Sequence, residues 1–115
     1  MSYMLMIIEP VGQRRERTEA EGHRVYEQML HFADKLKTRG VLRASESLAS
    51  GARRLQKRDG RQDILDGPFA EAKEMVGGFF LLDTASEDEA LAIAAECPAA
   101  EWCSVEVRQL APCYV

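Results

Sequence analysis

Two segments of the chain are apolar on both sides, and they restrict the folds that are open to it. The first runs from Tyr3 to Ile8 and the second from Phe79 to Leu82. Successive side chains of a strand point to opposite faces, so a strand without polar positions must be covered on both faces. Helices of the same chain can cover one face of a sheet. The other face would expose a large apolar patch, which predicts a homodimer with sheet facing sheet.

The remaining pattern places two helices and a hairpin around these segments. A capping box of Thr18 and Glu21 begins a helix that ends at Arg39, and Ser86 begins a second helix. Asp59-Gly60 between two extended runs is a strong hairpin signal. We expect strands over residues 3–9, 41–48, 76–83 and 102–110, with the hairpin over 52–58 and 61–65. This βαββαβ order predicts an α+β, ferredoxin-like plait with both helices on one face.

The composition excludes several classes of protein. The 115 residues, 46% of them hydrophobic, suit one globular domain over 1–115. The net charge of −4 argues against nucleic acid as the main partner, and no segment suits a membrane span or a signal peptide. Cys97, Cys103 and Cys113 have no metal-ligand spacing, and an odd number indicates reduced thiols. We expect a cytoplasmic protein without a metal or a cofactor.

The turn Asp66-Gly67-Pro68-Phe69 has the strongest functional pattern in the chain. Pro68 fixes its own φ and moves Gly67 away from helical angles, so a stiff loop holds a carboxylate beside an aromatic ring. A carboxylate in a partly apolar pocket is a candidate general base, and Asp66 would fill that role, with Phe69 contacting the ligand. The structural alternative is an Asp66 side chain that bonds to its own turn, with Phe69 in the core.

Four further residues are candidates for the same site. Lys73 and Glu74 follow the turn and could bind a ligand, although a solvated turn explains them equally well. Tyr26 lies at the flank of the first helix, where its hydroxyl could reach a pocket, although burial at the edge of the core explains it equally well. Histidine is the usual general acid or base near neutral pH, which makes His31 a catalytic candidate. However, both His23 and His31 lie off the apolar stripe of their helix, which favours a position in solvent.

Two other patterns favour structural explanations. The hairpin is basic, but it has no interleaved aromatic residue, so a charged, solvated edge is favoured over a phosphate-binding ribbon. Its basic residues are Arg53, Arg54, Lys57, Arg58 and Arg61. Gly77-Gly78 precedes no helix and is therefore no phosphate loop; it indicates the close approach of another part of the chain.

The run DGPFAEAKEMVGGFFLLD over residues 66–83 resembles the signature of the DGPF proteins, a branch of the YCII-related family. Residues 3–8 and 103–108 also resemble the ends of that family. The resemblance implies a ferredoxin-like domain that dimerises as an α/β barrel. Related proteins have been proposed to use a histidine paired with an aspartate. The position of their helix histidine falls near Met29 here, so this chain departs from that pattern.

Two functions agree with these observations. A few members of the family that the chain resembles are described as enzymes acting on small organic molecules. The first function is therefore a homodimer with a small-molecule pocket near Asp66, working as a cofactor-independent enzyme by proton transfer, elimination or hydrolysis. Some DGPF members are associated with extracytoplasmic-function sigma factors. The alternative is therefore a non-catalytic binding or regulatory module in such a pathway, which the missing helix histidine favours.

Overall fold

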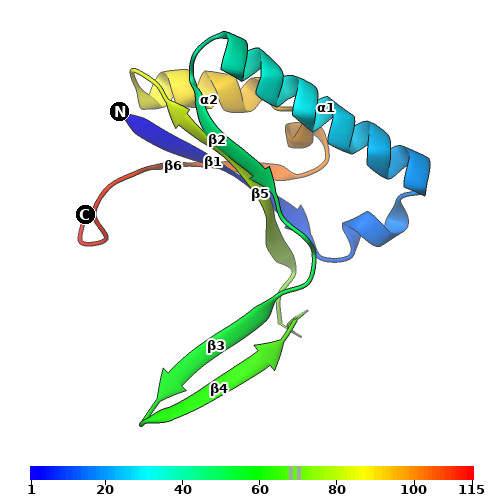
Figure 1. Ribbon diagram of the computed structural model, residues 1–115, viewed down its shortest axis with the longest axis vertical. Helices are drawn as coiled ribbons and strands as arrows, with labels where there is room; N and C mark the ends of the chain where they lie inside the picture. The colour runs from blue at the N-terminus through cyan, green and yellow to red at the C-terminus, as the bar shows by residue number, and fades with distance from the viewer. Residues whose placement is uncertain (68, 70) are drawn as a thin grey trace.

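The computed structural model describes residues 1–67, 69 and 71–115, and shows an antiparallel sheet with helices on one side (Figure 1). The sheet contains β1 (Ser2–Pro10), β2 (Leu42–Ser47), β5 (Glu74–Asp83) and β6 (Ser104–Gln109), in the order β2-β5-β1-β6. The helices are α1 (Glu19–Thr38) and α2 (Glu87–Glu96), with short 3-10 helices η1 (Gln13–Glu16) and η2 (Pro98–Glu101). Without the hairpin, the element order is the expected βαββαβ, compatible with a ferredoxin-like plait.

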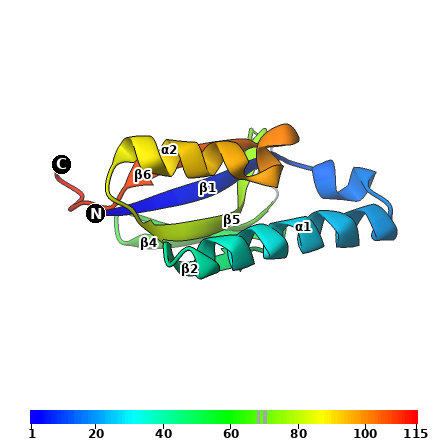
Figure 2. The same cartoon turned by 90° about the horizontal axis from the view of Figure 1, so that it is seen from above.

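Burial alternates along the central strands, because the helices of this chain cover only one face of the sheet. In β1, Leu5 and Ile7 face the helices and are buried, whereas Met4 and Met6 on the other face are half-buried. The core between the sheet and the helices contains Leu5, Ile7, Phe32, Leu36, Phe80, Leu82, Ile93, Ala94, Cys97 and Ala99. The opposite side, which we call the helix-free face, presents Met4, Met6, Ile8, Phe79 and Leu81. Both helices lie on the same side of the sheet in Figure 1, and Figure 2 shows them from above, along its two edges.

The helix ends follow the expected local signals. The Thr18 hydroxyl oxygen accepts the Glu21 N–H at 3.1 Å and caps α1, and the same hydroxyl donates to Glu21 Oε1 at 3.1 Å. Gly40 follows the last turn of α1 with a φ of 77°, a conformation that suits glycine. The Ser86 hydroxyl oxygen accepts the Glu89 N–H at 3.2 Å and caps α2 in the same way.

Removal of the first cap should destabilise the protein measurably. We expect Thr18→Ala to lower the free energy of unfolding by about 1 kcal/mol, because the Glu21 N–H loses its acceptor. Urea denaturation measures this difference, with Thr18→Ser as the control that keeps the hydroxyl. An unchanged midpoint for Thr18→Ala would mean that water replaces the cap at no cost.

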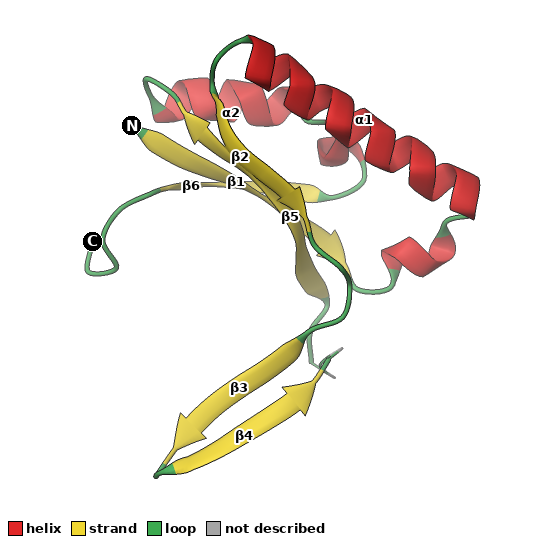
Figure 3. Ribbon diagram, viewed as in Figure 1, coloured by secondary structure: helices red, strands yellow, loops and turns green. Residues whose placement is uncertain are grey.

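The expected hairpin is present and projects from the sheet on the side away from the helices (Figure 3). It consists of β3 (Arg53–Arg58) and β4 (Arg61–Asp66), and we call it the β-arm. Leu55 and Ile64 are paired across it and are 55% and 45% exposed. The radius of gyration is 16.1 Å, whereas a compact domain of this length has about 13 Å. The described chain is therefore less compact than a self-contained globule.

Candidate functional site

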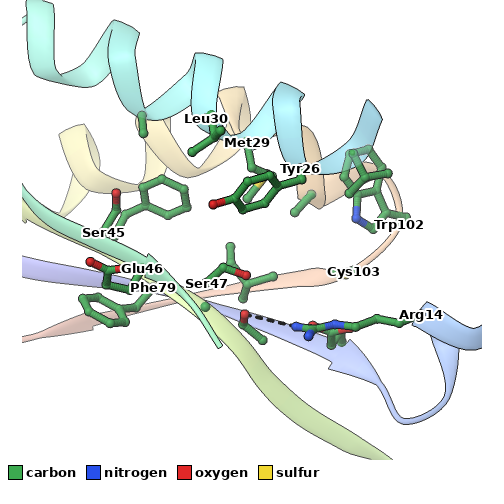
Figure 4. A pocket seen from close by; sticks show the side chains of 18 of the residues that line it. Arg14, Tyr26, Met29, Leu30, Ser45, Glu46, Ser47, Phe79, Trp102 and Cys103 are labelled. Atoms are coloured by element: carbon green, nitrogen blue, oxygen red, sulfur yellow. Dashed lines mark hydrogen bonds and ion pairs between the residues drawn. The ribbon is translucent and has the colours of Figure 1, made fainter. Parts of the chain in front are cut away.

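A cavity of about 340 Å³ lies between α1 and the helix-facing side of the sheet, and we call it the α1 cavity (Figure 4). Its volume is at the lower end of the range for small-molecule sites. Its apolar walls include Ile7, Val25, Met29, Leu30, Ala33, Phe80 and Trp102. Its polar groups include Glu9, Arg14, Arg17, Tyr26, Ser45 and Ser47. Apolar walls with a few placed polar groups are typical of sites for small organic molecules.

A carboxylate at the end of β1 lies buried in this cavity. Glu9 continues the inward-facing series of β1 and is only 5% exposed. The side chain of Arg14, from η1, donates from Nη2 to Glu9 Oε1 at 2.6 Å and from Nε to Oε2 at 3.0 Å. This two-point contact supplies the charge and hydrogen bonds that a buried carboxylate requires.

The same guanidinium connects the cavity with the base of the β-arm. Arg14 Nη1 donates to the Leu48 carbonyl at 2.7 Å, and Nη2 donates to the Gly77 carbonyl at 3.3 Å. A Cβ on Gly77 would overlap Glu9 Oε1, and one on Gly78 would lie 2.9 Å from the Glu46 carbonyl. The close approach predicted for the glycine pair is thereby confirmed. Its first member provides the space in which the Glu9 carboxylate lies.

A second set of polar contacts lies near the N-terminus of α1. Gln13 Nε2 donates to the Trp102 carbonyl at 2.7 Å, and Gln13 Oε1 accepts from Arg17 Nη2 at 3.2 Å. The Arg17 guanidinium lies 5.9 Å from the centroid of the Trp102 ring. The Cys103 thiol donates to Gln13 Oε1 at 3.4 Å. Burial, reinforced by the negative charge of Glu9, raises the pKa of Cys103, so this thiol remains protonated at neutral pH.

The arrangement is suited to binding and to proton exchange rather than to thiolate or metal chemistry. Glu9 offers acceptor oxygens in an apolar cavity, and the hydroxyl of Tyr26 lies between α1 and the sheet (Figure 4). Among residues 1–67, 69 and 71–115, no three His, Cys, Asp or Glu side chains gather as metal ligands do. No helix in the described part of the chain is both long and apolar enough to span a membrane.

The predicted site at the DGPF turn is not assembled around Asp66. The side chain of Asp66 is 81% exposed, and its Oδ1 accepts from Arg53 Nε at 3.0 Å at the base of the β-arm. The expectation of a partly apolar pocket around this carboxylate is therefore wrong, because β4 ends at Asp66 in solvent. Phe69 is half-buried beneath the guanidinium of Arg54, 3.8 Å from its ring centroid. Pro68, which belongs to the same turn, lies outside the described residues.

The remaining residues proposed from the sequence do not gather at one site. Lys73 and Glu74 are exposed, and Glu74 begins β5. Glu74 and Phe69 line a second hollow of about 540 Å³ beside the β-arm, which Asp66 does not join. His31 is exposed on α1. Of the residues proposed from the sequence, Tyr26 alone lines the α1 cavity.

The sequence analysis missed Glu9, Arg14 and Arg17. One signal could have identified the first of these residues. Tyr3, Leu5 and Ile7 set the inward phase of β1, and Glu9 is the next residue in that phase. A charged residue in a buried phase requires a partner or a ligand. The adjoining charged segment supplies that partner in Arg14.

The antiparallel sheet in βαββαβ order makes the chain an α+β domain compatible with a ferredoxin-like plait, with a cavity beneath its first helix. The family model of the YCII-related domain matches residues 1–113, and the chain belongs to this family. The resemblance to the YCII-related family is thus confirmed.

Two further similarities concern individual proteins. A segment of 54 residues is 50% identical to an uncharacterised protein of Rhizobium meliloti (strain 1021), covering 45% of this chain and 44% of that protein. The match thus spans less than half of the relative. The fold is similar to that of 5-chloro-2-hydroxyhydroquinone dehydrochlorinase from Burkholderia phenoliruptrix AC1100, solved in complex with 2,5-dihydroxybenzoquinone. The TM-score is 0.54 at 17% identity, over 96% of this chain and 94% of the other.

Proposed function

We propose that the protein is a cytoplasmic homodimer that binds a small organic molecule in the α1 cavity and exchanges a proton with it without a cofactor. The observation that carries this proposal is the Glu9 carboxylate, buried with Arg14 in a cavity with apolar walls. The fold similarity to a dehydrochlorinase, whose structure contains a dihydroxybenzoquinone, agrees with a small cyclic ligand. The three free thiols suit the reducing cytoplasm.

Each polar group has a distinct part in this chemistry. The Glu9 carboxylate accepts a hydrogen bond or a proton from a hydroxyl or an acidic C–H of the ligand. Arg14 has five N–H groups, of which four are used in the described contacts, so one on Nη1 can reach a ligand. The Tyr26 hydroxyl is available as a donor on the opposite wall. Apolar side chains around the reacting groups strengthen these interactions by excluding water.

The alternative function, a non-catalytic binding or regulatory module, is favoured by a specific contact. Both oxygens of Glu9 accept hydrogen bonds from Arg14, so each is already engaged by a protein donor. No histidine lines the α1 cavity among the described residues. A sensor that binds the same ligand without converting it would need no general base.

A second copy of the chain is proposed to cover the helix-free face. The apolar side chains of that face are only half-buried, and the C-terminal residues Tyr114 and Val115 are 87% and 88% exposed. The β-arm projects on the same side, where a neighbouring subunit could contact Leu55 and Ile64 (Figure 1). Two-fold pairing of the sheets would bury these groups at once.

Ligand binding can be tested by filling the cavity. We expect some small phenols or aromatic carboxylic acids at ten times Kd to stabilise the wild type by about 1.4 kcal/mol, which raises Tm by roughly 5 °C. Met29→Trp should abolish this rise, because Met29 lines the cavity. The matched control His31→Trp adds the same ring on the exposed side of α1 and should keep it. Differential scanning fluorimetry measures all three proteins.

Two further variants separate the possible outcomes. A rise in Tm that persists in Met29→Trp but disappears in Asp66→Ala would move the site to the DGPF turn and refute the cavity. For a ligand that binds, NMR spectroscopy of the mixture over hours shows whether it is converted. Conversion by the wild type and not by Glu9→Gln supports the enzyme, whereas binding without conversion supports the alternative module.

A further inference from the structure

We infer that Arg17 recognises a negative charge on the ligand, so that the α1 cavity takes a small aromatic anion such as a carboxylate or a phenolate. This inference rests on the proposed function, because it specifies what the same cavity binds. Among its described contacts, Arg17 has no counter-ion.

The charges around the cavity are unevenly compensated. Arg14 is paired with Glu9. Among the described residues, no carboxylate lies within 4.0 Å of the guanidinium of Arg17, which donates to the neutral amide oxygen of Gln13. Glu46 also borders the cavity, but it is exposed and lies on the side away from Trp102 (Figure 4). The end near Trp102 therefore has an excess positive charge.

This charge is held in a defined position. The Arg17 guanidinium lies over the Trp102 ring, and Gln13 links both residues through its side-chain amide. A cation–π contact and a hydrogen bond restrict the rotamers of a long side chain before the ligand arrives, which lowers the entropic cost of binding. Arg17 is half-buried, so its attraction for an anion is stronger than that of a fully solvated arginine.

The rest of the cavity suits a flat apolar body rather than a sugar or a flexible chain. Met29, Phe80 and Trp102 contribute large apolar surfaces to a space of about 340 Å³. A single substituted ring is compatible with that volume, and its negative substituent would meet Arg17 at the Trp102 end. Hydroxyl groups elsewhere on the ring could donate to Glu9.

The test compares matched acids and amides by isothermal titration calorimetry. The probes are benzoate against benzamide and phenylacetate against phenylacetamide, which differ mainly in charge. We expect the wild type to bind each acid about tenfold or more tightly than its amide. Arg17→Gln should remove that preference, and Arg17→Lys should keep part of it. Arg24→Gln, which removes an exposed arginine of α1 outside the cavity lining, should leave it unchanged.

Each other outcome contradicts the inference in a recognisable way. Equal affinities of the wild type for acid and amide would refute the role of Arg17 while leaving the cavity as a binding site. A preference that persists in Arg17→Gln would place the anion elsewhere. Absence of binding for all four probes would refute the inference, and failure of the wider phenol and acid screen would refute the cavity as well. If Arg17→Gln fails to fold, Arg17→Lys and the salt dependence of the wild type test the inference instead. A preference for the acid that does not weaken in 1 M KCl would contradict recognition by charge.

Discussion

Arg14→Met should lower the free energy of unfolding by about 3–5 kcal/mol at neutral pH, because it leaves the buried Glu9 carboxylate without its charge partner. The Gly77 carbonyl also accepts the Leu48 N–H at 2.9 Å, so it keeps a partner in the variant. Leu48 is exposed, so its carbonyl, which also loses Arg14, can accept from water instead. The expected cost therefore comes from Glu9 rather than from the backbone. Urea denaturation followed by circular dichroism measures the difference.

The double variant Glu9→Met/Arg14→Met is the control for this explanation. It removes the carboxylate together with the guanidinium, so most of the lost stability should return. Exposed surface pairs contribute only about 0–1 kcal/mol. A cost of that size for Arg14→Met alone would mean that water reaches Glu9, and the carboxylate would then lose its special position in the proposed site.

Met6→Asp should convert the proposed dimer into monomers. Met6 lies in the middle of β1 on the helix-free face, beside Phe79 and Glu106 on the neighbouring strands. An aspartate at this position would face an apolar subunit and a like charge, so we expect the dimer Kd to rise at least about 100-fold. Sedimentation velocity at micromolar concentration measures the assembly state.

The matched control for the dimer is Leu91→Asp. Leu91 is exposed on α2, on the other side of the sheet, so the same new charge should leave the dimer intact. A monomeric wild type would refute the proposed assembly. A Met6→Asp variant that remains dimeric would show that the subunits associate through another surface.

The helices and strands were predicted well because their signals are local. Thr18, Gly40 and Ser86 mark helix ends, and Asp59-Gly60 marks the hairpin, where φ is 51° and 74°. Each of these signals acts over a few residues, so the sequence is enough to read it. The strand β5 begins earlier than expected, at Glu74, because pairing with Pro10 extends it. That pairing joins distant parts of the chain.

The candidate site was predicted less well, for the same reason. Tyr26 lines the α1 cavity, and its direction could be inferred because its place on the amphipathic helix determines it. Asp66 has the more conspicuous motif, but a turn at the end of a projecting arm leaves a side chain in water. Arg14 was missed because the charged segment around it contains no local sign that it folds back onto β1.

The amino-acid sequence alone determined the order of the elements, their approximate ends and the two-sided apolar character of the central strands. These properties follow from caps, turns and periodicity, which depend on neighbours in the chain. Only the tertiary structure decided which polar groups meet. Glu9, Gly77 and Trp102 come from separate elements, and the packing of α1 and η1 on the sheet determines which charges are paired and which face a cavity.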